Sequence, residues 1–140
     1  MDGSPLPEDL RAPFVFRYSS LHHDITIPVA LKVGSRLVDA LAKIDTGATF
    51  CVFERHYAEA LGLEVESGEP LWMSTVNGRF QVYGHEVSIE MFEVEHTAVV
   101  YFYADHNFGR SVLGRRGWLD RVRMGIVDHD CELYLAPYND

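Results

Sequence analysis

Asp45, Thr46 and Gly47 are the residues whose types and spacing could do chemistry, and they directly follow an apolar, strand-like run at 38–44. A carboxylate at the end of a strand can act as a general acid or base when it points into a cleft. The glycine lets the backbone turn sharply, and the threonine hydroxyl can hydrogen-bond to a neighbouring backbone. Because the same residue types are common in turns, the triplet alone fits either a catalytic loop or an ordinary turn.

The elements that must position this triplet are mostly short strands, expected at 14–20, 25–33, 37–45, 70–76, 79–84, 85–95, 97–104 and on either side of 128–130. A helix is expected within 54–66, ending near Gly62, and a second short helix over 115–122. Asn77 and Gly78 predict a type I′ hairpin turn. The pattern indicates an all-β fold, either a small barrel or a sandwich.

The ordered set of motifs resembles the retropepsin-like aspartic proteases, the single-lobe, homodimeric kind, over residues 24–136. The likeness rests on AKIDTGAT at 42–49, the apolar strand and helix after it, the flap-like hairpin at 73–84 and SVLGRRGWLDR at 111–121. It implies a small closed barrel with one or two short helices and a flap hairpin. In that family the active-site loop rests against an apolar-apolar-Gly strand, which here would be Val112, Leu113 and Gly114.

The resemblance implies that each chain carries half of an active site. No second Asp-Thr-Gly or Asp-Ser-Gly is present, so the partner acid is expected to be Asp45 of another copy. The two carboxylates would share one proton, draw a proton from a water and protonate the scissile carbonyl oxygen. Asp45, Thr46 and Gly47 are thus the expected catalytic residues. The final strand at 131–137 is expected to help build the dimer interface, with the first strand at 14–18 as a further candidate.

The same resemblance implies substrate-binding residues on the loop, the flap and the supporting strand: Ala48, Val76, Asn77, Gly78, Phe80, Val112, Leu113 and Gly114. Closure of the flap would exclude water and add backbone hydrogen bonds to an extended peptide. The alternative for 75–80 is a plain surface hairpin.

Two positions depart from the family pattern. Ala48 stands where many pepsin-like sites have a hydroxyl residue, so the ionised carboxylate has less support and we expect a mildly acidic or neutral pH optimum. Thr49 stands where many viral relatives have an acid that pairs with the arginine after the second glycine. Arg115 is retained and needs another partner, for which Asp120 and Glu54 are candidates.

Composition and charge narrow the partners. A formal net charge of −9 argues against nucleic acid, and the sequence has no apolar run long enough to span a membrane. Residues 1–13 are acidic and Pro-rich, so we expect a flexible arm before a single domain at 14–140. The arm does not look like a signal peptide, and we expect a cytoplasmic protein. It could pack along a dimer, or reach the cleft as an autoinhibitory or processed piece.

The cysteines and histidines offer weaker chemistry. Cys51 and Cys131 are expected to be free thiols, with a disulfide as the alternative. Cys51 lies in the apolar run TFCVF, which favours a buried inert thiol over a nucleophile. The histidines at 22–23 and 129 lack metal-ligand spacing and fall in expected turns, so no metal or cofactor is expected.

The expected function is an aspartic endopeptidase, a homodimer acting on extended segments of a peptide or protein substrate. The alternative is a non-catalytic module of the same fold that dimerises or binds peptides. A third possibility is a monomeric β-barrel that binds a small ligand.

Overall fold

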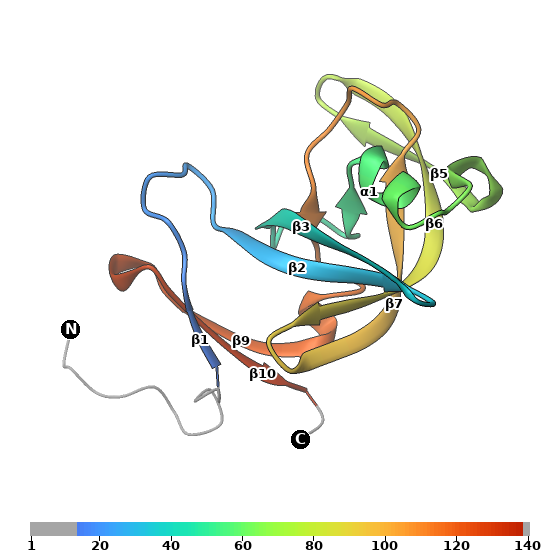
Figure 1. Cartoon of the computed structure of the whole chain (residues 1–140). Coiled ribbons are helices and arrows are strands. Elements are labelled where there is room, and N and C mark those ends of the chain that lie inside the picture. The colour runs from blue at the N-terminus through green and yellow to red at the C-terminus, as the bar shows by residue number, and fades with distance from the viewer. Residues whose placement is uncertain (1–13, 139–140) are drawn as a thin grey trace.

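A closed barrel forms the body of the chain in the computed structural model, which describes residues 14–138; the arm expected at 1–13 lies outside the described residues (Figure 1). Seven strands form one sheet in the order β2-β3-β8-β4-β7-β6-β5, and β2 also pairs with β6, which closes the sheet. Their bounds are β2 Thr26–Val33, β3 Arg36–Ile44, β4 Val52–Phe53, β5 Glu69–Thr75, β6 Gly78–Met91, β7 Val94–Tyr103 and β8 Val112–Leu113. The expected all-β fold is confirmed.

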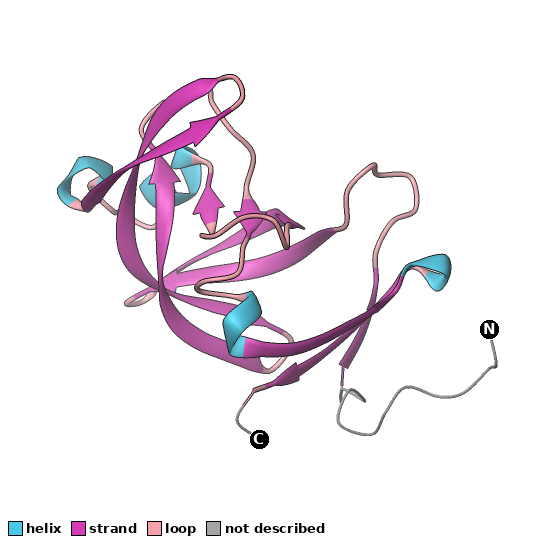
Figure 2. Cartoon of the chain, turned by 180° about the vertical axis from the view of Figure 1, so that it is seen from behind, coloured by secondary structure: helices cyan, strands magenta, loops and turns pink. Residues whose placement is uncertain are grey.

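A second, three-stranded antiparallel sheet extends from one side of the barrel (Figures 1 and 2). It contains β1 (Phe14–Arg17), β9 (Val122–Val127) and β10 (Glu132–Pro137), in the order β1-β10-β9. Leu133 and Leu135 of β10 are fully buried against the barrel core. β10 has a neighbour on each side, so the free edges of this sheet belong to β1 and β9.

The helical content is small. Helix α1 spans Arg55–Ala60, and Gly62 follows with a φ of +77°, as its expected position near the helix end requires. The helix expected over 115–122 is wrong: only a 3₁₀ turn forms, at Leu119–Arg121. Gly117 has a φ of +103°, which a right-handed helix does not allow, and the Asp120 carboxylate accepts the Gly117 N–H at 2.9 Å. Two further 3₁₀ turns lie at Val65–Ser67 and Asp128–Asp130.

Two hairpin turns differ from the expected ones. Thr75 pairs with Gly78, so Val76 and Asn77 form the turn between β5 and β6; neither has a positive φ, and the expected type I′ turn is wrong. The strand expected at 85–95 is broken by a turn at Phe92 and Glu93, between β6 and β7. Phe92 has a φ of +55°, and its ring stacks on Phe14 at 5.3 Å, a tertiary contact that the local sequence did not signal.

The long strand β6 joins the β5–β6 hairpin to the barrel wall. Val82 and Gly84 are buried in one alternation, whereas Val87, Ile89 and Met91 are buried in the opposite one, so the inward face changes along the strand. The first part packs with Val52 and Tyr103, and the second part joins the main core. The hairpin above the barrel is thus anchored by one continuous strand.

His96 on β7 links the barrel wall to the segment after β8. Its Nε2 lies 2.7 Å from the carbonyl oxygen of Gly117, so this nitrogen carries the proton and donates it. The ring is half-buried, and its Nδ1 has no partner among the described residues 14–138. Burial lowers the pKa of His96, because the charged ring would lose hydration.

This histidine should make stability depend on pH. Because its pKa is lowered in the fold, the unfolded chain binds more protons just below the ordinary histidine pKa of about 6.5. Stability is then fully present above that value and falls as the pH drops toward the folded pKa. In thermal denaturation between pH 7 and 5, His96→Gln should lose part of the wild-type decline in Tm, whereas the exposed control His129→Gln should keep all of it. Equal declines in both variants would contradict this account.

Candidate active site

Asp45 is placed by the parallel pairing of β3 with β8. Ile44 lies opposite Leu113, and the Asp45 N–H donates to the Leu113 carbonyl oxygen at 3.0 Å. Lys43 makes the preceding bond, from its N–H to the Ser111 carbonyl oxygen at 2.9 Å. Asp45 therefore lies directly after the last residue of β3, and its carboxylate is one-third exposed, at 34%.

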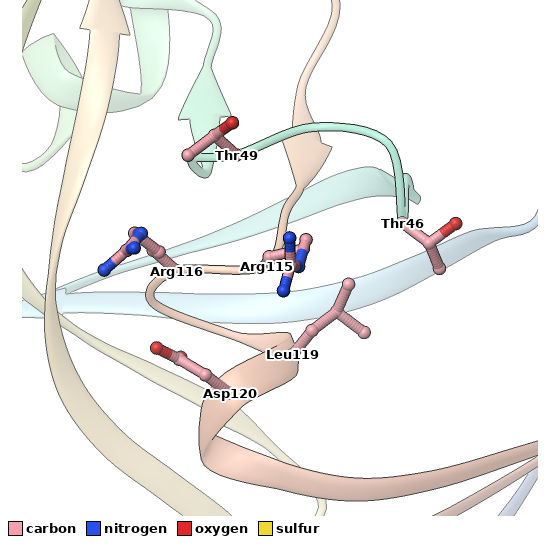
Figure 3. A pocket seen from close by; sticks show the side chains of 6 residues that line it. All are labelled: Thr46, Thr49, Arg115, Arg116, Leu119 and Asp120. Atoms are coloured by element: carbon pink, nitrogen blue, oxygen red, sulfur yellow. The ribbon is translucent and has the colours of Figure 1, made fainter.

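A tight turn fixes the carboxylate. The Gly47 N–H donates to Asp45 Oδ1 at 3.0 Å, and the Ala48 N–H donates to the Asp45 carbonyl oxygen at 3.1 Å. Thr46 and Gly47 are exposed at the tip of this turn. One oxygen of Asp45 is thus held by the backbone. The exposed Thr46 side chain projects from the tip of the turn (Figure 3).

The segment 48–50 lies directly on the backbone around Gly114. The Arg115 N–H donates to the Ala48 carbonyl oxygen at 2.9 Å, and the Arg116 N–H donates to that of Thr49 at 2.8 Å. A Cβ on Gly114 would lie 2.3 Å from the Phe50 carbonyl oxygen and 2.8 Å from that of Ala48. Glycine is therefore required there by close approach, as the expected crossing of loop and strand demands.

A cleft of about 460 Å³ opens beside Asp45 under the β5–β6 hairpin. Its lining includes three of the expected substrate-binding residues, Ala48, Phe80 and Val112. It also includes residues that the sequence did not predict to bind substrate: Thr49, Phe50, Val52, Met73, Ser74, Thr75 and Tyr103.

The other expected substrate-binding residues lie away from this lining. Val76, Asn77 and Gly78 form the hairpin tip, where Val76 is fully exposed. Leu113 is fully buried and Gly114 lies beneath the loop, so both support the loop from behind.

Aromatic packing fixes the base of the hairpin. Phe80 lies 5.5 Å from Tyr103 and 5.1 Å from Phe108, measured between ring centroids. The Tyr103 hydroxyl donates to the Arg110 carbonyl oxygen at 2.9 Å, and burial raises the pKa of Tyr103. This hydroxyl therefore stays protonated and keeps the 104–111 loop against the hairpin.

A chain of charges reaches Asp45 from two loops. Lys43 Nζ lies 4.0 Å from Asp45 Oδ2 and 3.6 Å from Asp24 Oδ1, and Arg110 pairs with the other oxygen of Asp24. Lys43 had a sequence signal, since residues two apart in a strand share a face. Asp24 and Arg110 had none, because loops distant in sequence bring them together.

A larger hollow of about 580 Å³ lies beside the turn that follows Asp45 (Figure 3). It is lined by Thr46, Thr49, Arg115, Arg116, Leu119 and Asp120. Asp45 does not line this hollow, whereas it does line the cleft under the hairpin.

Arg115 does not pair with either acid that the sequence suggested. The Asp120 carboxylate accepts the Gly117 N–H, and that of Glu54 lies 3.1 Å from His56. Within the described residues 14–138, no carboxylate lies within 4.0 Å of the Arg115 guanidinium.

The cysteines and the possible metal ligands of the described residues form no second reactive site. Both cysteines are free, and burial raises the pKa of Cys51 to about 11, which disfavours the reactive thiolate. No group of three or more histidine, cysteine or acidic side chains within 14–138 could hold a metal ion. In the same residues, no helix has the length and apolar character needed to cross a membrane.

Comparisons with known proteins agree with this geometry. A family model described as aspartyl protease matches residues 29–116. Among solved structures, a retropepsin-like aspartic protease from Rickettsia conorii matches with a TM-score of 0.60 and 17% identity, over 87% of this chain and 96% of that one. EIAV protease, solved with the inhibitor HBY-793, matches with a TM-score of 0.54 and 17% identity, over 69% and 86%. No curated protein matches the chain. At this identity the structural likenesses show a shared fold.

The contact at Gly114 can be tested by one added methyl group. Gly114→Ala should destabilise the chain by at least about 2 kcal/mol, because the new Cβ meets backbone atoms that cannot move aside without shifting the turn. The control is Gly34→Ala, where the Cβ meets no atom within 4 Å and only the φ of +59° costs about 1 kcal/mol. Urea denaturation measures both. A cost at Gly114 no larger than at Gly34 would refute the close-approach argument.

Proposed function

The chain belongs to the aspartyl protease family, and we propose on that premise that it is an aspartic endopeptidase that hydrolyses peptide bonds in extended polypeptide segments. One observation carries the proposal: among the described residues 14–138, Asp45 is the only carboxylate that lines the cleft. It is partly exposed, is held by the Gly47 N–H and lies beside the exposed Thr46. A single carboxylate with this presentation is half of an acid–base pair.

The second half comes from Asp45 of another copy, across a two-fold axis near Thr46. Two carboxylates at hydrogen-bond distance share one proton, because a second negative charge there is strongly disfavoured. The ionised carboxylate draws a proton from a water, and the protonated one donates to the scissile carbonyl oxygen. Thr46 of each chain then bonds across the axis and keeps the carboxylates coplanar.

The substrate lies extended between the catalytic turn and the β5–β6 hairpin. Ala48, Phe80 and Val112 line the cleft, and there they contact the side chains of the substrate. Val76, Asn77 and Gly78 contact the substrate only when the exposed hairpin tip closes over it. Leu113 and Gly114 contribute by supporting the turn.

The edge of β9 is the surface that receives the second copy. β10 cannot pair with another chain, because β1 and β9 occupy both its sides. β9 begins two residues after Asp120, which lines the same hollow as Thr46 and Leu119, whereas β1 lies at the opposite edge of the sheet. A chain that pairs with β9 thus brings its own Thr46 toward this one.

The catalytic role of Asp45 can be tested with one isosteric change. Asp45→Asn should lower cleavage by about 10²–10⁴-fold, because the amide cannot exchange the proton. Mass spectrometry of a mixed peptide library incubated between pH 3 and 8 measures the products. The control is Asp39→Asn, which makes the same change at an exposed position of the same strand and should leave cleavage intact. Cleavage by Asp45→Asn at the wild-type rate, or none by the wild type while it stays dimeric, would favour the non-catalytic module.

The dimer surface can be tested with a charge on each edge of the small sheet. Ile126→Lys on β9 should weaken the dimer at least about tenfold, because an ammonium group would be buried between the copies. Activity should fall with the dimer fraction and recover at higher protein concentration. Val15→Lys on β1 is the matched control, since this residue is also exposed on an edge strand. Sedimentation velocity in which Ile126→Lys remains a full dimer would place the interface elsewhere.

A further inference from the structure

Lys43 faces the oxygen of Asp45 that the backbone leaves open. The Gly47 N–H takes Oδ1, and Lys43 Nζ lies 4.0 Å from Oδ2. Both side chains are about one-third exposed, at 32% for Lys43 and 34% for Asp45. A cation at this distance in a partly shielded site interacts with a carboxylate more strongly than it would in bulk water.

Two further charges hold Lys43 in this position. Asp24 Oδ1 lies 3.6 Å from its Nζ, and Arg110 pairs with the other oxygen of Asp24. The Arg110 guanidinium also holds the pKa of Asp24 below its usual range, so Asp24 stays ionised in mild acid and keeps its hold on Lys43. The ammonium group is therefore tethered between two carboxylates and does not project freely into solvent.

Within residues 14–138, no charged side chain other than Lys43 lies within 4.0 Å of the Asp45 carboxylate. On the cleft side, Tyr103 is neutral and bonded to a carbonyl oxygen. β8 contributes Val112 and Leu113, which carry no charge. Beside the turn, Arg115, Arg116 and Asp120 line the separate hollow with Thr46. Among the described residues, Lys43 is the charged group within 4.0 Å of the Asp45 carboxylate.

We propose that Lys43 is a positioning residue for the reaction: its ammonium group favours the ionised Asp45 pair and so sets the pH range in which the enzyme works. This inference rests on the proposed peptidase function. It assigns to the residue two places before the catalytic acid an electrostatic role that acts through Asp45 and not through contact with the substrate.

The direction of the effect follows from charge alone. A nearby cation stabilises a carboxylate anion, so the pair reaches its singly ionised, active state at lower pH than it would without Lys43. Loss of the second proton also moves to lower pH, and so does the fall in activity on the basic side of the pH profile. Ala48 offers no hydroxyl to the carboxylate, so the Lys43 ammonium group, 4.0 Å from Oδ2, is the side-chain group that stabilises the anion.

The test is the pH dependence of kcat/KM for a peptide that the wild type cleaves, since this profile reports groups of the free enzyme. Lys43→Met removes the charge and keeps most of the stem. Both limbs should move up by about half to one pH unit, and activity two pH units below the optimum should fall about three- to tenfold. Lys43→Arg should restore the wild-type profile. The matched control is Lys32→Met, because Lys32 on β2 is similarly exposed and ion-paired, to Glu95.

Several outcomes would overturn the proposal. One is an unmoved profile in Lys43→Met; a change confined to KM would instead mean that Lys43 contacts the substrate. A shift of equal size in Lys32→Met would make the effect one of general charge. If the wild type cleaves nothing, the proposed function fails, but ¹³C NMR titration of the Asp45 carboxyl carbon still tests Lys43. A midpoint that does not rise in Lys43→Met overturns the electrostatic role, and one that rises supports it.

Discussion

The site depends on one backbone contact, the place where the turn after Asp45 lies on Gly114. Two hydrogen bonds, from the N–H groups of Arg115 and Arg116, fix the carbonyl oxygens of Ala48 and Thr49. These bonds form only because position 114 has no side chain. The parallel pairing of β3 with β8 also acts through the backbone, because its register fixes where Asp45 lies along β8. The carboxylate is therefore held by main-chain geometry, through the strand pairing and the Gly47 N–H at Oδ1, and its Oδ2 makes no hydrogen bond to the backbone of the described residues.

The sequence predicted what local chemistry controls. The turn Asp45 to Gly47 and the end of α1 at Gly62 follow from residue types within a few positions, and the structure places both as expected. The predictions failed where contacts beyond the immediate turn signals determine the local structure. Phe92 forms a turn without a turn residue because its ring packs on Phe14, and no helix forms at 115–122 because Asp120 and Gly117 stabilise a 3₁₀ turn.

Of the charged residues around Asp45, the sequence could predict only Lys43, which lies two positions away. Alternate residues of a strand lie on the same face, so the sequence alone predicts that Lys43 and Asp45 are neighbours. Asp24 and Arg110 lie 86 positions apart and meet because two loops converge on the same end of the barrel. The cleft lining has the same character: Phe80 lies next to Tyr103 and Phe108 through packing between the hairpin and the 104–111 loop.

Two-fold symmetry changes how each of these residues acts in the proposed dimer. Any group near the axis occurs twice around one shared proton. Two Lys43 ammonium groups and two Ala48 methyl groups therefore lie near the same pair of Asp45 carboxylates. A single substitution therefore alters both carboxylates together and leaves them equivalent. In a two-lobed enzyme one lobe can change alone and distinguish the acid from the base. In the proposed dimer the acid and the base would be distinguished only by the position of the proton, and the electrostatic field of the surrounding residues would set the pH at which that proton is held.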